Sequence, residues 1–248
     1  MKFLKIIGIG LKYLKYISCY KKGLDSVFKN KKRLIIMCPG PSVMEKIKEN
    51  KGLIESSTTV GVNSFILSDF EADAYFMEFK SDIELNRINQ SSDKREIVFA
   101  SFNRNKSKIF IPESSENYLS GRSDFCLKLD HYFYLLVPLI FRSKFLIILY
   151  FYIIYMISLL TYKLPTLIMY GDYTVSRILA CCFILNVKEV VIVGMDNTND
   201  YFWNVSPKSE IKEHPILENK NIIPPEELIS IISSLWRPFA GSMKITVL

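Results

Sequence analysis

The chain lacks the usual patterns of metal-binding and disulfide-linked proteins. It has five cysteines and two histidines in 248 residues, and no two cysteines form a Cys-x-x-Cys motif. A zinc site is therefore not expected, and irregularly spaced cysteines in odd number favour reduced thiols in a cytosolic compartment. Because lysines interrupt the N-terminal apolar residues throughout, no secretory signal peptide is expected either.

Two common phosphate-binding fingerprints are also missing. The chain has no Gly-Lys-Ser or Gly-Lys-Thr and no Gly-x-Gly-x-x-Gly, which excludes a Walker loop and the standard dinucleotide fingerprint. It does have an apolar run, Leu34 to Met37, that breaks into Cys38-Pro39-Gly40-Pro41-Ser42 and is followed by a helical pattern over 43–50. This order is typical of the first strand, turn and helix of an α/β domain, where phosphates are commonly bound.

The charge and hydropathy of the chain point to an anionic or lipid partner. The net charge is +7, and the mean hydropathy is +0.16 with a pI near 9.0. Such a balance suits nucleic acid, an anionic membrane or a phosphorylated substrate equally well. Residues 1–30 have the pattern of a basic amphipathic helix, with lysines gathered on one side, which predicts contact with a membrane surface; an ordinary helix packed on the domain is the alternative. The lysines on that side are Lys2, Lys5, Lys12 and Lys15.

A second lipophilic segment lies in the middle of the chain. Residues 145–162 contain no charged side chain and reach the lower length limit for a membrane span. A span would put the strand before Gly40 and the later core strands on opposite sides of the membrane, where one sheet could not hold both. We therefore expect a helical hairpin, or a helix within one leaflet, in an apolar helical insertion at about 131–165 that serves as a lid or membrane contact.

The rest of the chain alternates short apolar strands with helical spacers. This alternation predicts one α/β catalytic domain over 31–248, Rossmann-like, with a mostly parallel sheet and helices on both faces. The expected strands are 34–37, 58–62, 74–77, 97–99, 108–111, 189–196 and 244–248, and the expected helices include 43–50, 175–185 and one that begins at Pro224-Pro225.

Polar turns follow several of these strands or precede a helix. Ligands of an open parallel sheet bind beyond the carboxyl ends of its strands, so these turns are predicted to share one crevice. The predicted nucleotide-binding residues are Gly40, Pro41, Ser42, Asn63, Ser64, Asp172, Thr174 and Asp196.

Each predicted binding residue has a chemical reason and a plainer alternative. Gly40 lets the backbone approach a phosphate, and Ser42 and Thr174 offer donors at helix starts. Asn63 suits a ribose or base edge because it both donates and accepts hydrogen bonds. The plainer interpretations are a tight turn at Pro39–Pro41, a strand-end cap at Asn63, and an Asp196 that only caps the next helix or loop.

Two residues of the polar loop 197–221 are candidates for catalysis. His214 can act as a general base near neutral pH, and Tyr201 can pack on a sugar or stabilise a leaving phosphate. The alternatives are a solvent-exposed loop histidine and a hydrophobic loop anchor.

Together these segments resemble the bacterial lipooligosaccharide sialyltransferases (glycosyltransferase family 42) and related surface-polysaccharide transferases. That family opens with a strand and Gly-Asn-Gly-Pro-Ser, whose last three residues match Gly40-Pro41-Ser42. A strand ending in asparagine follows, as at Asn63. Later come a turn, a buried helix and a Lys-Glu strand ending in Gly-x-Asp, as in Lys188-Glu189 and Gly194-Met195-Asp196. The resemblance covers residues 33 to about 70 and 168 to about 215.

The resemblance implies a Rossmann-like, inverting and metal-independent transferase that uses a nucleotide-sugar donor and needs no cofactor. CMP-sialic acid is one candidate donor, and a lipid-linked or surface glycan is the implied acceptor. Gly40, Ser42, Asn63 and Thr174 would contact the nucleotide, His214 would be the base, and Tyr201 would stabilise the leaving phosphate. The family's Gly-Asn is Cys38-Pro39 here, and Thr198 stands where the family has a tyrosine.

The sequence thus predicts a glycosyltransferase of lipopolysaccharide or surface-polysaccharide synthesis at the cytoplasmic face of the inner membrane, peripheral or monotopic. Its predicted partners are a nucleotide sugar, a glycan or lipid-linked acceptor and an anionic membrane surface, without nucleic acid. Monomer and homo-oligomer both stay open. Two alternatives are an enzyme like the 6-hydroxymethylpterin diphosphokinases, which share the Gly-Pro-Ser and Gly-x-Asp pattern, and a non-catalytic membrane scaffold with a degenerate site.

Overall fold

Seven parallel strands form the centre of the molecule. The computed structural model describes residues 23–29, 31–63, 65, 68–77, 108–112, 131–134, 143–161, 174–196, 224–238 and 240–248. Within these ranges the sheet has the order β5-β4-β3-β2-β1-β6-β9, and each neighbouring pair is parallel. Its strands are β1 (Arg33–Met37), β2 (Thr58–Val62), β3 (Ala74–Phe76), β4 (Lys108–Pro112), β5 (His131–Tyr134), β6 (Glu189–Val193) and β9 (Lys244–Val247). A small antiparallel pair, β7 (Trp236–Arg237) and β8 (Gly241–Ser242), stands beside it.

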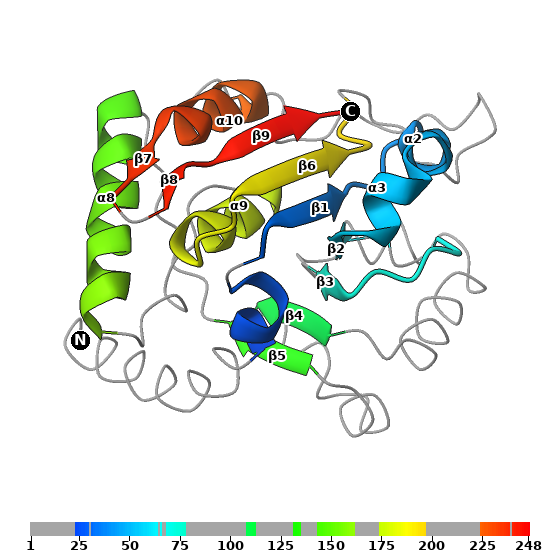
Figure 1. The fold of residues 1–248 in the computed structure, drawn as a ribbon, viewed down its shortest axis with the longest axis horizontal. Coiled ribbons are helices and arrows are strands. Elements are labelled where there is room, and N and C mark those ends of the chain that lie inside the picture. The colour runs from blue at the N-terminus through cyan, green and yellow to red at the C-terminus, as the bar shows by residue number, and fades with distance from the viewer. Residues whose placement is uncertain are drawn as a thin grey trace, which may run out of the picture.

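The order of the strands reverses next to β1. The chain adds β2, β3, β4 and β5 on one side of β1 and then returns to its other side for β6 and β9. Figure 1 shows β1, β6 and β9 pointing the same way, toward the part of the molecule where α2 and the C-terminus lie. The predicted α/β, Rossmann-like fold is confirmed, and the described sheet is parallel throughout rather than mostly parallel.

Helices cover both faces of this sheet. Alternate residues of β1 point to opposite faces, so that Leu34 and Ile36 enter one core cluster and Ile35 and Met37 enter the other. The first cluster also holds side chains of α8 (Lys144–Thr161), α9 (Thr174–Ile184) and α10 (Pro225–Ser234). The second holds side chains of α2 (Val43–Glu49) and α3 (Lys51–Glu55). The predicted covering of both faces is therefore confirmed.

The end of the predicted N-terminal helix belongs to the core. Residues 23–28 are helical, and their apolar side chains Leu24, Val27 and Phe28 are buried. The Phe28 ring meets the Phe76 ring edge to face, with 5.9 Å between centroids. These residues pack on the sheet. The prediction of membrane contact covered residues 1–30, and of these residues 1–22 lie outside the described part of the chain.

The helical insertion predicted at about 131–165 is corrected at its beginning. Residues 131–134 form β5, which pairs with β4 so that Ile109 is opposite His131. The run His-Tyr-Phe-Tyr favours a strand because aromatic side chains fit a pleated surface. Within the described part of 131–165, the helix is α8, which begins at Lys144.

Helix α8 is fixed to the domain by its inner side. The rings of Phe151 and Tyr155 both pack against Phe183 of α9, and the Tyr155 hydroxyl donates to Asn186 Oδ1 at 3.3 Å. No helix in the described ranges meets the length and hydropathy needed to cross a bilayer. The expected strand at 97–99 lies outside these ranges.

A buried arginine joins the end of α9 to the small β7–β8 pair. The Arg237 side chain is fully buried, and its guanidinium donates to the carbonyls of Phe183 at 3.1 Å, Val187 at 3.0 Å and Gly241 at 3.0 Å. A longer contact of 3.5 Å reaches the Cys182 carbonyl. The bond to Phe183 satisfies a carbonyl in the last turn of α9 that has no partner within the helix, and the other two bonds tie the arginine to the segment after α9 and to β8.

Candidate functional site

Strands β1, β2 and β6, which adjoin the point where the strand order reverses, end at the same level of the sheet. Met37, the last residue of β1, is paired with Gly61 of β2 on one side and with Val193 of β6 on the other. Because all three strands are parallel, the residues that follow them leave the sheet at one edge, the carboxyl edge. The prediction that the Pro-Gly-Pro-Ser turn, Asn63 and the Gly194–Asp196 segment share one edge of a continuous sheet is confirmed.

The Pro-Gly-Pro-Ser turn is packed directly against the segment that follows β6. Cys38 and Gly40 donate their backbone N–H groups to the carbonyls of Val193 at 2.8 Å and Gly194 at 3.1 Å. A Cβ added at Gly40 would lie 2.4 Å from the Gly194 oxygen and 2.5 Å from Asp196 Oδ2. Glycine is therefore required at position 40 by the approach of these two segments.

Gly194 is a site residue that the sequence-based prediction did not include. It has a φ of +70°, and a Cβ there would lie 2.5 Å from the Val43 Cβ and 2.8 Å from the Cys38 carbonyl oxygen. Both the left-handed backbone and the lack of space require glycine. The available signal was its position, since it follows the apolar run of β6 directly.

Asp196 caps helix α2 from a distant part of the chain. Its carboxylate accepts the backbone N–H of Ser42 through Oδ2 at 2.9 Å and the Ser42 hydroxyl through Oδ1 at 2.8 Å. A carboxylate at a helix N-terminus is favourable because the first N–H groups and the helix dipole are positive there. Asp196 therefore fixes the start of α2 to the end of β6.

The donors of the Pro-Gly-Pro-Ser turn have partners within the protein. The Ser42 N–H and hydroxyl bond to Asp196, the Gly40 N–H bonds to Gly194, and the Val43 N–H bonds to the Gly40 carbonyl at 3.2 Å. Pro39 and Pro41 have no N–H to offer. All the backbone donors from Cys38 to Val43 thus bond within the protein, and the ligand contact predicted for Ser42 stays a prediction.

We expect Asp196→Ala to lower the free energy of unfolding by about 1–2 kcal/mol, because it removes both bonds that cap α2. Asp196→Asn should lower the free energy of unfolding by less, since the amide oxygen of asparagine can still accept one of the two bonds. Urea denaturation of the two variants beside the wild type measures this order. Equal stability of all three proteins would show that the Ser42–Asp196 bonds do not hold the turn.

Asn63 and Thr174 form a second contact between distant segments. Asn63 follows β2 with a φ of +48°, a conformation that asparagine adopts more readily than most residues. Its Nδ2 donates to Thr174 Oγ1 at 3.3 Å. Thr174 is the buried first residue of α9, so α9 also begins at the carboxyl edge, on the sheet face opposite α2.

The buried thiol beside this edge is not a nucleophile. Burial raises the pKa of Cys38 to about 12, and the Asp196 carboxylate adds to the shift. Burial also raises the pKa of Cys182. Since the thiolate is the reactive form, neither side chain can supply covalent catalysis near neutral pH. Within the ranges that the structure describes, no group of histidine, cysteine and carboxylate side chains is arranged to hold a metal.

We expect Cys38 and Cys182 in the native protein to resist alkylation by iodoacetamide at pH 8, with peptide mass spectrometry as the readout. Both thiols should react once the protein is unfolded. Because their folded pKa values lie above the unfolded ones, the unfolded chain releases protons first as the pH rises. Stability should therefore fall as the pH rises above about 9, the ordinary thiol value, toward 12. Rapid native alkylation of Cys38 would contradict this assignment.

Four predicted site residues lie outside the described part of the chain: Ser64, Asp172, Tyr201 and His214. The carboxyl edge therefore brings together Gly40, Pro41, Ser42, Asn63, Thr174 and Asp196. The general base and the tyrosine remain predictions from the sequence.

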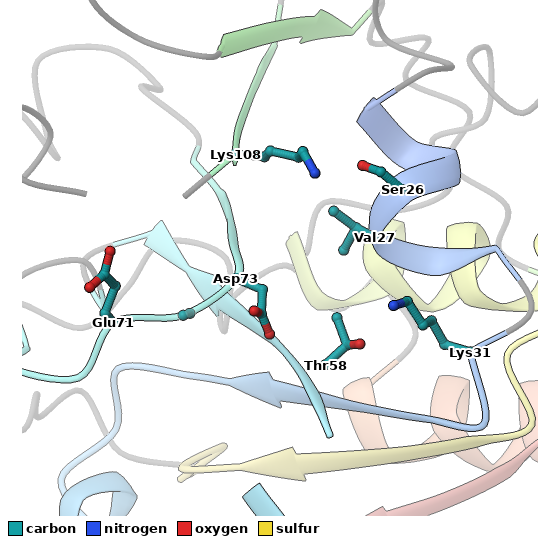
Figure 2. Close-up of a pocket in the computed structure, with 8 residues that line it drawn as sticks. Ser26, Val27, Lys31, Thr58, Glu71, Asp73 and Lys108 are labelled. Atoms are coloured by element: carbon teal, nitrogen blue, oxygen red, sulfur yellow. The ribbon is translucent and has the colours of Figure 1, made fainter. Parts of the chain in front are cut away.

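A cavity of about 440 Å³ lies at the opposite, amino-terminal edge of the sheet (Figure 2). Lys31 and Lys108, which stand just before β1 and at the start of β4, contribute to its wall with Thr58 and Asp73. The Asp73 carboxylate already accepts bonds from the Thr59 N–H at 2.8 Å and the Thr59 hydroxyl at 3.0 Å. Of the predicted site residues that the structure describes, none lines this cavity.

Comparisons with known proteins show a distant likeness in structure and none in sequence. No protein-family model matches the chain, and no curated protein sequence matches it. Among solved structures, the fold is similar to the monofunctional alpha-2,3-sialyltransferase Cst-I from Campylobacter jejuni. The TM-score is 0.43 at 16% sequence identity, over 90% of this chain and 77% of that chain. Because this likeness is distant, the site is interpreted from its own geometry.

Proposed function

We propose that this protein is a glycosyltransferase that binds a nucleotide-sugar donor at the carboxyl edge of β1, β2 and β6. The observation that carries the proposal is the pair of long-range contacts at this edge, Ser42 with Asp196 and Asn63 with Thr174. They join four separate segments where the strand order reverses, and in open α/β sheets ligands bind at such a reversal. The residues concerned also carry the family resemblance in the sequence.

The geometry favours a division of roles between the two contacts. The donors of the Pro-Gly-Pro-Ser turn bond within the protein, so this turn is suited to shape one wall against the nucleoside. Asn63 and the start of α9 are then the better candidates to receive the phosphate, because a helix N-terminus favours an anion. A phosphate held there would be stabilised as it departs from the sugar.

The proposed reaction is an inverting, metal-independent transfer. His214 would accept the proton of the acceptor hydroxyl while that oxygen attacks the anomeric carbon. The bond from that carbon to the phosphate oxygen breaks, and the nucleotide leaves with the electron pair. Tyr201 would donate a hydrogen bond to the leaving phosphate. CMP-sialic acid is the first donor to test, with a lipid-linked or surface glycan as acceptor.

The test is a panel of sugar nucleotides incubated with the full-length protein, with released nucleotide as the readout. We expect one donor to be consumed, and His214→Ala to lower the rate by about a hundredfold or more. The matched control is His131→Ala, which changes the other histidine of the chain, at the start of β5, and should leave the rate unchanged. The proposed reaction would be refuted if no sugar nucleotide were consumed, or if His214→Ala released nucleotide at the wild-type rate.

A further inference from the structure

The outer side of α8 is an exposed apolar stripe. Phe145 is 69% exposed, and the other four members of the stripe are 42–49% exposed. Phe145, Leu149, Ile153 and Met156 are spaced by four, four and three residues, which places them along one side of a helix. We define the α8 stripe as Phe145, Leu146, Leu149, Ile153 and Met156.

A stripe of this kind is unusual for a helix on a protein surface. A surface helix normally turns charged or polar residues toward water. Helix α8 instead buries Ile147, Phe151 and Tyr155 in the core and exposes large apolar side chains on its other side. Its outer side therefore needs an apolar partner.

The charges around α8 indicate which partner fits. From His131 to Gly171 the sequence has three cations, Arg142, Lys144 and Lys163, and no acidic residue. Lys144 at the start of α8 is exposed. Exposed apolar side chains next to an exposed lysine, in a stretch of sequence without acidic residues, complement a bilayer with anionic headgroups, where the side chains enter the acyl region and the cation meets phosphate.

The size of the stripe argues against a second copy of the chain as its partner. Taking about 200 Å² for a fully exposed large side chain, the exposed fractions of the five residues correspond to roughly 500 Å². A stable interface between two proteins needs about 800 Å² on each side. A bilayer has no such threshold, because the burial of a few apolar side chains adds to the electrostatic attraction between cations and anionic lipids.

We infer that the α8 stripe is the surface by which this protein lies on an anionic membrane. The inner contacts of α8 with α9 hold the helix against the domain, so the outer side alone enters the interface. In Figure 1, α8 stands at the end of the molecule away from the arrowheads of β1 and β6. Docking through it leaves the carboxyl edge uncovered. The inference does not depend on the proposed transferase activity.

The test is sedimentation of the full-length protein with phosphatidylcholine vesicles, with and without phosphatidylglycerol. We expect binding to the anionic vesicles, and a loss of more than about tenfold in the variant Leu149→Gln/Ile153→Gln/Met156→Gln. Lys144→Glu should weaken binding by about fivefold or more. The matched control Val247→Gln, at an apolar side chain 45% exposed on β9, should bind like the wild type.

Three outcomes would overturn the inference. The first is unchanged vesicle binding of the triple variant, which would place the contact in another segment such as residues 1–22. The second is no vesicle binding by the wild type. The third is a wild-type dimer in light scattering that the triple variant alone abolishes, which would make a second copy the partner. Thermal unfolding of each variant, with and without nucleotide, checks separately that the fold and the carboxyl edge are intact.

Discussion

Replacing Gly194 by alanine is expected to lower the free energy of unfolding by about 2–5 kcal/mol. A left-handed conformation costs an ordinary residue about 1–2 kcal/mol, and overpacking a tight contact costs about 1–3 kcal/mol more. Both apply, since Gly194 has a φ of +70° and its added Cβ would lie 2.5 Å from the Val43 Cβ. Because Val43 begins α2, the change should also displace the turn that forms the wall of the proposed site. Urea denaturation measures the loss.

Two other glycines separate the causes of this loss. Gly241 has a φ of +72° and open space around its Cβ position, so Gly241→Ala should lose only the conformational part, about 1–2 kcal/mol. Gly52, in α3, has open space around its Cβ position and a φ outside the left-handed region. Gly52→Ala should therefore raise the free energy of unfolding by about 0.5–1 kcal/mol. If Gly194→Ala lowered the free energy of unfolding by no more than Gly241→Ala does, the turn would not be packed closely on the end of β6.

Replacing Arg237 by methionine is expected to lower the free energy of unfolding by about 3–5 kcal/mol. The substitution leaves the carbonyls of Phe183, Val187 and Gly241 without the donor that now lies 3.0–3.1 Å away. A buried acceptor without a partner costs about 1–3 kcal/mol. The guanidinium also stands over the Phe183 ring, 5.3 Å from its centroid. The loss would be a large part of the total stability of an ordinary domain.

Arg237→Lys tests whether geometry or charge is responsible. Lysine keeps the charge but cannot reach several carbonyls at once, so we expect a loss nearly as large as for methionine. Trp236→Ala changes the neighbouring side chain, which is 58% exposed, and should alter stability by less than about 1 kcal/mol. Thermal denaturation of the three variants would contradict this account if Arg237→Lys matched the wild type.

The sequence was most informative about the strands and their ends. Apolar runs such as Leu34–Met37 and Val190–Val193 predicted the central strands because a parallel strand buried on both faces is apolar throughout. The breaks after them predicted which turns would meet, since parallel strands end at one edge. The run His131–Tyr134 was misassigned because its aromatic residues adjoin the apolar helix, and hydropathy alone does not separate a strand from a helix.

The roles of individual side chains were harder to predict. Ser42 was predicted as a ligand contact, but its bond to Asp196, 154 residues further along the chain, was not predicted. That contact depends on how β1 and β6 pair, which no local pattern contains. The same holds for Gly194, whose need for glycine comes from the nearby Val43, and for Arg237, whose partners belong to α9 and the β7–β8 pair.

The most direct test of the account is isothermal titration of the protein with CMP, CDP, UDP and ATP with magnesium. We predict that one pyrimidine nucleotide binds and that Asn63→Ala and Thr174→Val each weaken its binding by about tenfold, the value of one hydrogen bond. Lys108→Gln, in the cavity at the opposite edge, should leave the affinity unchanged. Binding of no nucleotide, or binding that depends on Lys108 and not on Asn63, would contradict a nucleotide site at the carboxyl edge.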